Sequence, residues 1–212
     1  MADLHFYFDP VCPWAYITSR WVVEVQRQRN YDVSWKFISL YMINNDRGYN
    51  ESNKSHMEGH TGGLHALRVA SAARAAAGND AVAAVYTALG KAIHADKRRP
   101  TAAADMQGLM REVLTEAGLN PQWAESATDP LHDEVIRFET THALSLTGKD
   151  VGTPILVFHP DAPNESSFFG PVISAIPRGD DALRLWDAVE TLATTSGMAE
   201  LKRSLRSAPK FD

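Results

Sequence analysis

The stretch "FDPVCPWAY", residues 8–16, decides the fold, because it marks the place where a strand gives way to a helix. Residues 4–8 are few, apolar and aromatic-rich, which predicts a buried strand. Asp9-Pro10 ends that strand, and Pro13 suits the first position of a helix, where no backbone donor is needed. Apolar residues then recur every four positions and predict a helix to about residue 29: Ile17, Trp21 and Val25.

Three further strands are predicted, one before and two after a long middle segment. Residues 33–40 predict a second strand, and strand, helix and strand in such a short span form a parallel βαβ unit. Residues 155–158 are a short apolar run, and residues 167–169 follow a turn, so the two segments predict a β-hairpin. A helix is predicted over 180–195, then a short helix over 198–205 and a frayed tail.

The middle segment has helical character. A polar loop and helix entry is predicted over 44–63, followed by helices over 64–77, 80–95 and 103–117 and by two pieces that begin at Pro121 and Pro130. We therefore divide the chain into a thioredoxin-like domain, residues 1–45 and 149–212, and a helical insertion, residues 46–148. The predicted fold class is α/β: a thioredoxin-like βαβ plus ββα sheet with a large all-helical insertion.

Composition excludes several classes of function. The chain of 212 residues has a formal net charge of -5 and a sequence pI of 5.9, which gives no electrostatic case for binding nucleic acid or an anionic membrane. No segment approaches the roughly 18 apolar residues of a membrane span, and no secretory signal is evident. Cys12 is the only cysteine, so an intramolecular disulfide is excluded. We expect a cytoplasmic protein, where a lone thiol stays reduced.

Cys12 stands at the last loop position before the predicted helix. Unpaired backbone N–H groups and the positive end of the helix dipole favour a thiolate there. We therefore expect a nucleophilic cysteine with a pKa lowered from about 8.5 to roughly 3.5–7.5. Asp9 would act in the opposite direction, although its main expected role is to cap the turn before Pro10. The alternative is a buried, inert structural cysteine.

Two motifs and the element order together resemble a known superfamily. "DPVCPWA" (9–15) and "VGTP" (151–154) are similar to motifs of the DsbA-like branch of the thioredoxin superfamily. That branch includes disulfide oxidoreductases, kappa-class glutathione transferases and 2-hydroxychromene-2-carboxylate isomerases. Further stretches resemble the actinobacterial mycothiol-dependent nitroreductase family along essentially the whole chain, among them "KFISLYMINNDR" (36–47), "GKDVGTPILVF" (148–158) and "FFGPVISAIPRGDDALRLWDA" (168–188).

The resemblance implies a thiol-dependent reductase with no tightly bound cofactor. A low-molecular-weight thiol, mycothiol, would supply electrons, and the substrate would be a disulfide or another electrophile. Cys12 is implied as the nucleophile, with a cis peptide bond before Pro154 and a backbone at Thr153 that pairs with substrate. Family members carry two cysteines, and Ala15 stands where the second, resolving cysteine would be. The expected cycle is therefore a monothiol one, in which a second thiol from solution resolves a mixed disulfide on Cys12.

Other residues are expected near the site. Pro13 and Trp14 follow the nucleophile, and the Trp14 ring is expected to form a wall of the cleft. The alternative for Trp14 is a surface aromatic residue at a helix start. The resemblance also places Asn44 and His94 at the cleft as thiol or substrate contacts. The alternative is a local role for each: a loop turn for Asn44, and a helix C-terminus for His94.

A metal site and two further functions remain as weaker interpretations of the sequence. The spacing of His56, His60 and His65 across a glycine-containing stretch makes a metal site a weak interpretation. A kappa-class transferase or isomerase would use position 12 to activate a bound thiol without redox change, although those families have serine there. A scaffold that only binds thiols or a partner protein is the non-enzymatic alternative. The aromatic and alanine-rich faces of the helical block are candidates for a homodimer interface.

Overall fold

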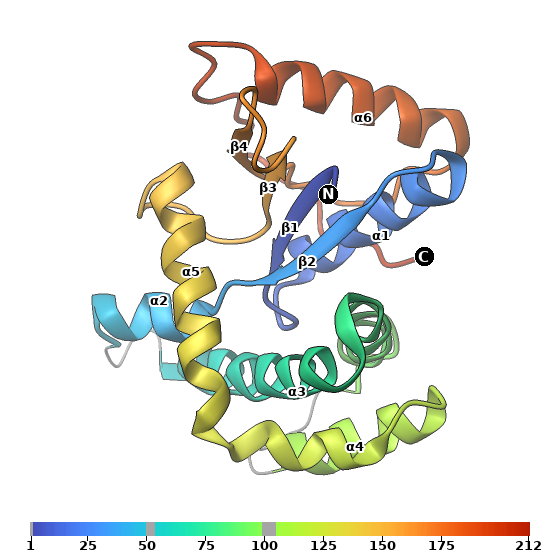
Figure 1. Ribbon diagram of the computed structural model, residues 1–212, viewed down its shortest axis with the longest axis vertical. Coiled ribbons are helices and arrows are strands. Elements are labelled where there is room, and N and C mark those ends of the chain that lie inside the picture. The colour runs from blue at the N-terminus through green and yellow to red at the C-terminus, as the bar shows by residue number, and fades with distance from the viewer. Residues whose placement is uncertain (1, 50–53, 99–104) are drawn as a thin grey trace.

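A four-stranded sheet forms the centre of the molecule. The computed structural model describes residues 2–49, 54–98 and 105–212, and the strand order is β2–β1–β3–β4 (Figure 1). The central strand β1 (Leu4–Phe8) is parallel to β2 (Val33–Phe37) and antiparallel to β3 (Ile155–Phe158). The other edge, β4 (Ser166–Phe169), pairs with β3 as the second strand of the predicted hairpin.

Helices connect the two halves of this sheet. α1 (Pro13–Gln28) joins β1 to β2, and α6 (Gly179–Thr194) follows β4. The segment between β2 and β3 contains α2 (Leu40–Arg47), α3 (Lys54–Gly90), the π-helical turn η2 (Lys91–Ala95), α4 (Met106–Glu116), the 3₁₀ segments η4 (Pro121–Thr128) and η5 (Pro130–His132), and α5 (Asp133–Thr147). The predicted thioredoxin-like fold with a helical insertion is confirmed. No helix within the described ranges is long and apolar enough to cross a membrane.

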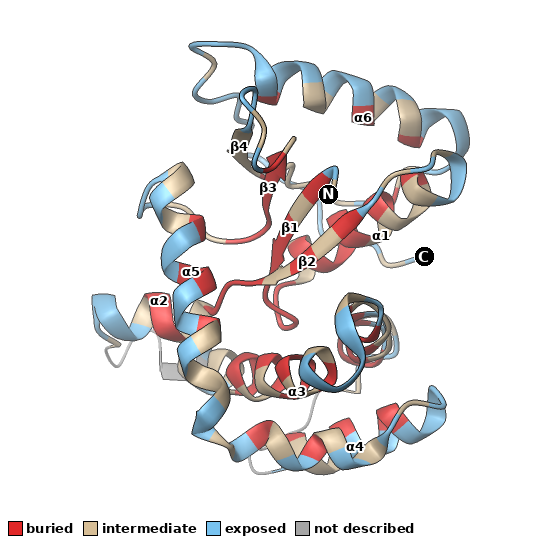
Figure 2. Ribbon diagram, viewed as in Figure 1, coloured by how far each residue is buried: buried red, intermediate tan, exposed pale blue. Residues whose placement is uncertain are grey.

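Side chains alternate between the faces of the sheet and divide the core in two. Phe6 and Phe8 of β1 belong to the larger cluster, which aromatic residues of three helices complete: Trp21 of α1, Tyr86 of α3 and Trp186 of α6. Tyr7 belongs to a smaller cluster, with Ile155 and Val157 of β3 and residues of α2 and α5. Figure 2 shows the buried residues concentrated in β1, β2, β3, α1 and α3. Each large apolar side chain buried in this way contributes about 1.5–3 kcal/mol.

Among the residues that the structure describes, side chains of the insertion, and no further strand, pair with the outer edge of β2. The amide of Asn79 accepts a hydrogen bond from the N–H of Trp35 at 2.8 Å and donates to the carbonyl of Val33 at 2.8 Å, as a neighbouring strand residue would. Further along, the carboxylate of Glu139 accepts from the N–H of Phe37 at 2.7 Å. These contacts satisfy backbone groups that an edge strand otherwise leaves open.

Three local predictions are wrong. The strand predicted over 33–40 ends at Phe37, because Ser39 caps α2 and its hydroxyl accepts a hydrogen bond from the N–H of Met42 at 3.3 Å. The polar loop and helix entry predicted over 44–63 is largely helical where it is described, since α2 extends to Arg47 and α3 begins at Lys54. The two helices predicted over 64–77 and 80–95 are confirmed, because α3 is interrupted at Gly78, where φ is 79° and the backbone is not helical. No helix forms over 198–205. Residues 50–53 of the predicted loop and residues 103–104 of the helix predicted over 103–117 lie outside the described residues.

The C-terminal tail, residues 195–212, has no helix or strand and returns from the end of α6 towards α1 (Figure 1). The N–H of Lys210 donates to the carbonyl of Ser174 at 2.8 Å. The ring of Phe211 lies 5.6 Å from the ring of His94 and 6.3 Å from that of Tyr16. The tail that the sequence predicts to be frayed is therefore anchored by its last residues.

Candidate active site

Cys12 is the N-cap residue of α1 and faces the loop before β3. Its Sγ accepts a hydrogen bond from the N–H of Ala15 at 3.5 Å, as a capping side chain does at a helix start. On the other side, the thiol donates to the backbone carbonyl of Thr153 at 3.5 Å. The fold thus brings together two motifs that lie far apart in the sequence, and Ala15 contributes only its backbone to the sulfur.

The loop that carries Thr153 is held in place by its own hydrogen bonds. The Thr153–Pro154 peptide bond is cis. The Thr153 hydroxyl donates to the carbonyl of Tyr7 at 3.1 Å, and the carbonyl of Pro154 accepts from the N–H of Gly170 at 2.8 Å. The side chain of Thr153 therefore holds the loop against β1, and its backbone carbonyl is the group that meets Cys12.

A buried carboxylate lies at the start of the Cys12 loop. Asp9 is fully buried, and its two oxygens accept hydrogen bonds from the N–H of Val11 at 3.1 Å and the N–H of Leu40 at 2.8 Å. Burial raises the pKa of Asp9 to about 7, against the opposing effect of these two donors. The sequence predicts the turn cap, but it gives no sign of the bond that ties this turn to the start of α2.

Burial also sets the protonation state of Cys12. The residue is 7% exposed, and burial raises the pKa of its thiol to about 11. The N–H of Ala15 acts in the opposite direction, and the charge of Asp9 adds to the increase. The expected lowering of this pKa is wrong for this conformation, because removing water from the sulfur outweighs the favourable helix start. The resting thiol is protonated at neutral pH, which agrees with its hydrogen bond to Thr153.

Pro13 and Trp14 form the first turn of α1 beside the nucleophile. Pro13 occupies the beginning of the helix, as predicted. Trp14 is half-buried, and the guanidinium carbon of Arg206 lies 5.9 Å from the centre of its ring. The tail therefore contacts Trp14, which lies two residues after Cys12. Local patterns in the sequence do not indicate this contact.

His94 supports the loop that carries Cys12. It lies in η2, at the end of α3, and its ring is buried. Its Nε2 is 2.9 Å from the carbonyl oxygen of Pro10, and its ring stacks at 5.3 Å on the ring of Tyr16. π-Helical turns often occur at functional sites. His94 thus joins the predicted site through Pro10 and Tyr16.

The remaining predicted residues have local partners. The amide of Asn44 donates to the carbonyl of Leu40 at 2.7 Å, which lies within α2 and does not bring Asn44 to Cys12. His60 lies 2.9 Å from the hydroxyl of Tyr49, and its ring stacks on that of His56 at 6.3 Å. In the part of the chain that the structure describes, no three side chains of His, Cys, Asp or Glu come together as metal ligands.

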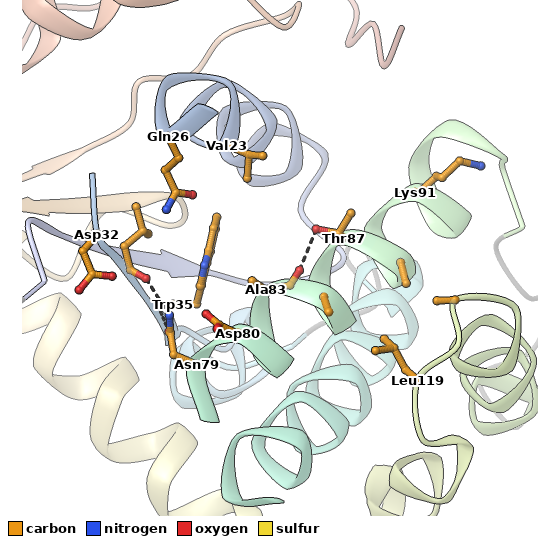
Figure 3. Close-up of a pocket in the computed structure, with 14 residues that line it drawn as sticks. Val23, Gln26, Asp32, Trp35, Asn79, Asp80, Ala83, Thr87, Lys91 and Leu119 are labelled. Carbon is orange, nitrogen blue, oxygen red and sulfur yellow. Dashed lines mark hydrogen bonds between the residues drawn. The ribbon is translucent and has the colours of Figure 1, made fainter. Parts of the chain in front are cut away.

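A groove of about 570 Å³ lies between α1, the start of β2 and the second part of α3 (Figure 3). None of the predicted site residues lines it, and Val33 in its wall pairs with Leu4, at the end of β1 that lies away from Cys12. Three of its polar side chains already have partners: Asn79 with β2, Gln26 with the carbonyl of Tyr31, and Lys91 with Asp96. We therefore do not assign the substrate to this groove.

Sequence reasoning also misses a glycine that lets α3 approach the Cys12 loop. A Cβ atom on Gly63 would lie 2.5 Å from a carboxylate oxygen of Asp9 and 2.8 Å from a methyl carbon of Val11. For the tail, one signal exists in the sequence: Phe211 is the only aromatic residue after α6. Such an isolated aromatic in a polar segment indicates an anchor.

The fold is shared with proteins of thiol chemistry. The chain is similar to the cytosolic disulfide reductase DsbM from Pseudomonas aeruginosa with GSH, at a TM-score of 0.56 and 16% identity, over 88% of this chain and 98% of that one. It is also similar to a 2-hydroxychromene-2-carboxylate isomerase, at a TM-score of 0.56 and 14% identity, over 88% of this chain and 93% of that one. These likenesses define a DsbA-like fold.

Fold, sulfur site and sequence together define an enzyme of the thiol–disulfide oxidoreductase class. Residues 11–203 match the Rv2466c-like family, described as mycothiol-dependent nitroreductase Rv2466c, and the chain belongs to this family. The uncharacterized protein Rv2286c of Mycobacterium tuberculosis (strain ATCC 25618 / H37Rv) is 29% identical over 208 residues, which are 96% of this chain and 82% of that protein. The family and enzyme class that the sequence motifs imply are confirmed.

Proposed function

We propose that this protein is a cytoplasmic, mycothiol-dependent reductase that works through Cys12 alone. The observation that carries the proposal is the place of Cys12, which caps α1, meets the carbonyl of Thr153 and has Ala15 where a resolving cysteine would follow. The family description supports mycothiol as the thiol, and DsbM with GSH supports the binding of a small thiol in this fold. A compartment that keeps thiols reduced fits a site with one cysteine.

The proposed cycle has two thiol–disulfide exchanges. The Cys12 thiolate attacks the sulfur of the R group in a mixed disulfide X–S–S–R, where R is mycothiol. A bond forms between Sγ and that sulfur, and X–S⁻ leaves and takes a proton from solvent. A second mycothiol thiolate then attacks the R sulfur of the adduct and releases Cys12. In sum, X–S–S–R and one R–SH become X–SH and R–S–S–R, and the protein is unchanged.

The first exchange requires Cys12 to lose the proton that burial retains. When substrate or water reaches Sγ, the cost of burying the charge falls, while the N–H of Ala15 still favours the thiolate. The carbonyl of Thr153, which accepts from the thiol at rest, then becomes available to the substrate. Activation is therefore coupled to substrate entry.

A nitro substrate would draw on the same supply of thiols. Reduction of a nitro to a nitroso group by two mycothiol molecules releases one disulfide and one water. With one cysteine in the chain, both electrons must come from thiols in solution. The monothiol cycle therefore does not depend on which substrate accepts the electrons in the cell.

The test is the intact mass of the protein after incubation with oxidised mycothiol or oxidised glutathione at several pH values. We expect an adduct of one thiol that forms faster with mycothiol, forms faster as the pH rises, and is reversed by added thiol. Cys12→Ser, which keeps a capping hydroxyl, is the matched control and should form no adduct. An unmodified protein that forms none at any pH contradicts the proposal.

One observation favours a second function. The Cys12 thiol is protonated and donates a hydrogen bond, as a serine hydroxyl could at this position. This suits a kappa-class transferase or a 2-hydroxychromene-2-carboxylate isomerase, in which the residue activates a bound thiol without redox change. Catalysis of such a reaction by Cys12→Ser, with no mixed disulfide in the unmodified protein, would favour this alternative over the reductase.

A further inference from the structure

The C-terminal tail carries a cation to the edge of the active site. Arg206 is exposed, and its guanidinium lies over the ring of Trp14, two residues after Cys12. Within the described chain, no carboxylate lies at ion-pair distance from Arg206, whereas Lys202 of the same tail pairs with Glu200 at 3.9 Å. The guanidinium donors of Arg206 are therefore available to a ligand while its face rests on Trp14.

Independent contacts fix this segment of the tail. Phe211 stacks on His94 and lies at a tilt beside Tyr16, and the N–H of Lys210 donates to the carbonyl of Ser174 in the loop after β4. His94 in turn contacts the carbonyl of Pro10, which precedes the nucleophile. The tail is thus joined, four and five residues after Arg206, to the elements that hold Cys12.

The tail that reaches the site carries an excess of positive charge. The chain as a whole carries a formal net charge of -5. Residues 199–212, in contrast, contain four basic side chains and two acidic ones: Lys202, Arg203, Arg206 and Lys210 against Glu200 and Asp212. The positive end of α1 points to the same place. A negatively charged group would be favoured here and repelled by much of the remaining surface.

We propose that Arg206 determines specificity by binding an anionic group of the substrate that reacts with Cys12. This inference rests on the proposed function and adds a substrate class: a disulfide or other electrophile that carries a carboxylate, sulfonate or phosphate close to the reacting atom. In the disulfide X–S–S–R, the anionic group belongs to X. Trp14 supplies the ring on which the guanidinium is held, and Phe211 is a positioning residue for the tail.

The test compares two small disulfides, the anionic dithiobis(nitrobenzoate) and the neutral dithiodipyridine. Each reacts with the Cys12 thiolate to form one mixed disulfide and release one coloured aryl thiol or thione, so the absorbance of the leaving group gives the rate. The quantity of interest is the ratio of the anionic to the neutral rate. This ratio cancels any change in the reactivity of Cys12 itself.

We expect Arg206→Ala to lower this ratio by about two- to fivefold, the effect of one exposed ion pair. High salt should remove the difference between the two proteins. Phe211→Ala should lower the ratio as well, because the tail loses its anchor. Arg184→Ala is the matched control: it removes the same charge from an exposed position on α6, where Arg184 pairs with Asp181 at 3.5 Å.

The outcomes separate the two proposals. A ratio that Arg206→Ala leaves unchanged, or that Arg184→Ala lowers equally, overturns the assignment to Arg206 while the reductase proposal stands. Absence of an adduct with either disulfide overturns both, because Cys12 would then not be a nucleophile.

Discussion

The two sides of the Cys12 site are built in different ways. On one side, Asp9 and Thr153 are buried, and their side chains form hydrogen bonds with the backbone of Leu40 at the start of α2 and of Tyr7, respectively. On the other, the exposed Arg206 lies over the half-buried ring of Trp14, and Phe211 stacks on His94. The buried side holds the reacting atoms and belongs to the core, whereas on the tail side Trp14 and Phe211 pack only against the edge of the core and Arg206 is exposed. Changes on the buried side should therefore affect chemistry and stability together, and changes on the tail side should affect selectivity more than stability.

The largest effect is expected from substitution of the nucleophile itself. Cys12→Ser keeps a capping oxygen and removes the thiol, so we expect mycothiol-dependent disulfide reduction to fall by at least about a thousandfold. The measurement is the initial rate of reduction, with thermal unfolding as the control for folding. Activity within tenfold of the unmodified protein, with unchanged unfolding, would remove Cys12 from the reaction.

The next effect is a pH dependence of stability that comes from Asp9. Its pKa in the folded chain is about 7, above the ordinary value of 3.8, so the folded state retains a proton that the unfolded state has already released. This contribution is complete at low pH and is lost as the pH rises through 7. For the unmodified protein, we expect a loss of up to about 4 kcal/mol of unfolding free energy from this group.

Asp9→Asn tests this by removing the titration. The variant has one acceptor oxygen for two N–H donors and should be less stable at low pH, but its unfolding free energy should change less between about pH 4 and pH 7. Urea denaturation at both pH values measures the difference. Equal changes in the two proteins would show that Asp9 titrates normally in the fold.

A third prediction tests how closely α3 approaches the buried side. Gly63→Ala places a methyl group against the carboxylate of Asp9 and against Val11, and it should destabilise the protein by about 1–3 kcal/mol. Gly59→Ala on the same helix meets no atom within 4 Å and should stabilise it by about 0.5–1 kcal/mol. Denaturant midpoints measure both. Two stabilising substitutions would mean that α3 does not press on the Cys12 loop.

The smallest effect is expected on the tail side. Phe211→Ala should lower the unfolding free energy by about 1 kcal/mol, because the half-buried ring packs only at the edge of the larger core cluster. It should nevertheless speed trypsin cleavage after Arg206, since the anchor on His94 and Tyr16 is lost. Leu205→Ala, at a residue that is 88% exposed, is the control and should leave the cleavage rate unchanged. A large loss of stability in Phe211→Ala would place the tail in the core.

Local signals in the sequence predict one part of the site and not the other. The positions of proline and aromatic residues around Cys12 and Thr153 predict the strand, the turn and the helix that bring these two residues together. The pKa of Cys12 depends on how much water the whole fold removes, and the bond from Leu40 to Asp9 joins segments that local patterns do not connect. The tail is missed for a third reason: a polar, extended segment has no periodicity, so only the isolated Phe211 marks its anchor.

The edge of β2 has a consequence for the order of synthesis. Glu139, which covers the N–H of Phe37, lies 102 residues further along the chain. At ribosomal speeds of about 5–20 residues per second, the nascent βαβ unit waits roughly 5–20 s for that partner, and still longer for β3 on its other side. During this interval β2 offers unpaired backbone to any neighbouring chain. Nascent chains should therefore aggregate when the protein is expressed at a high level. We expect this aggregation under conditions in which the folded protein does not yet unfold on heating.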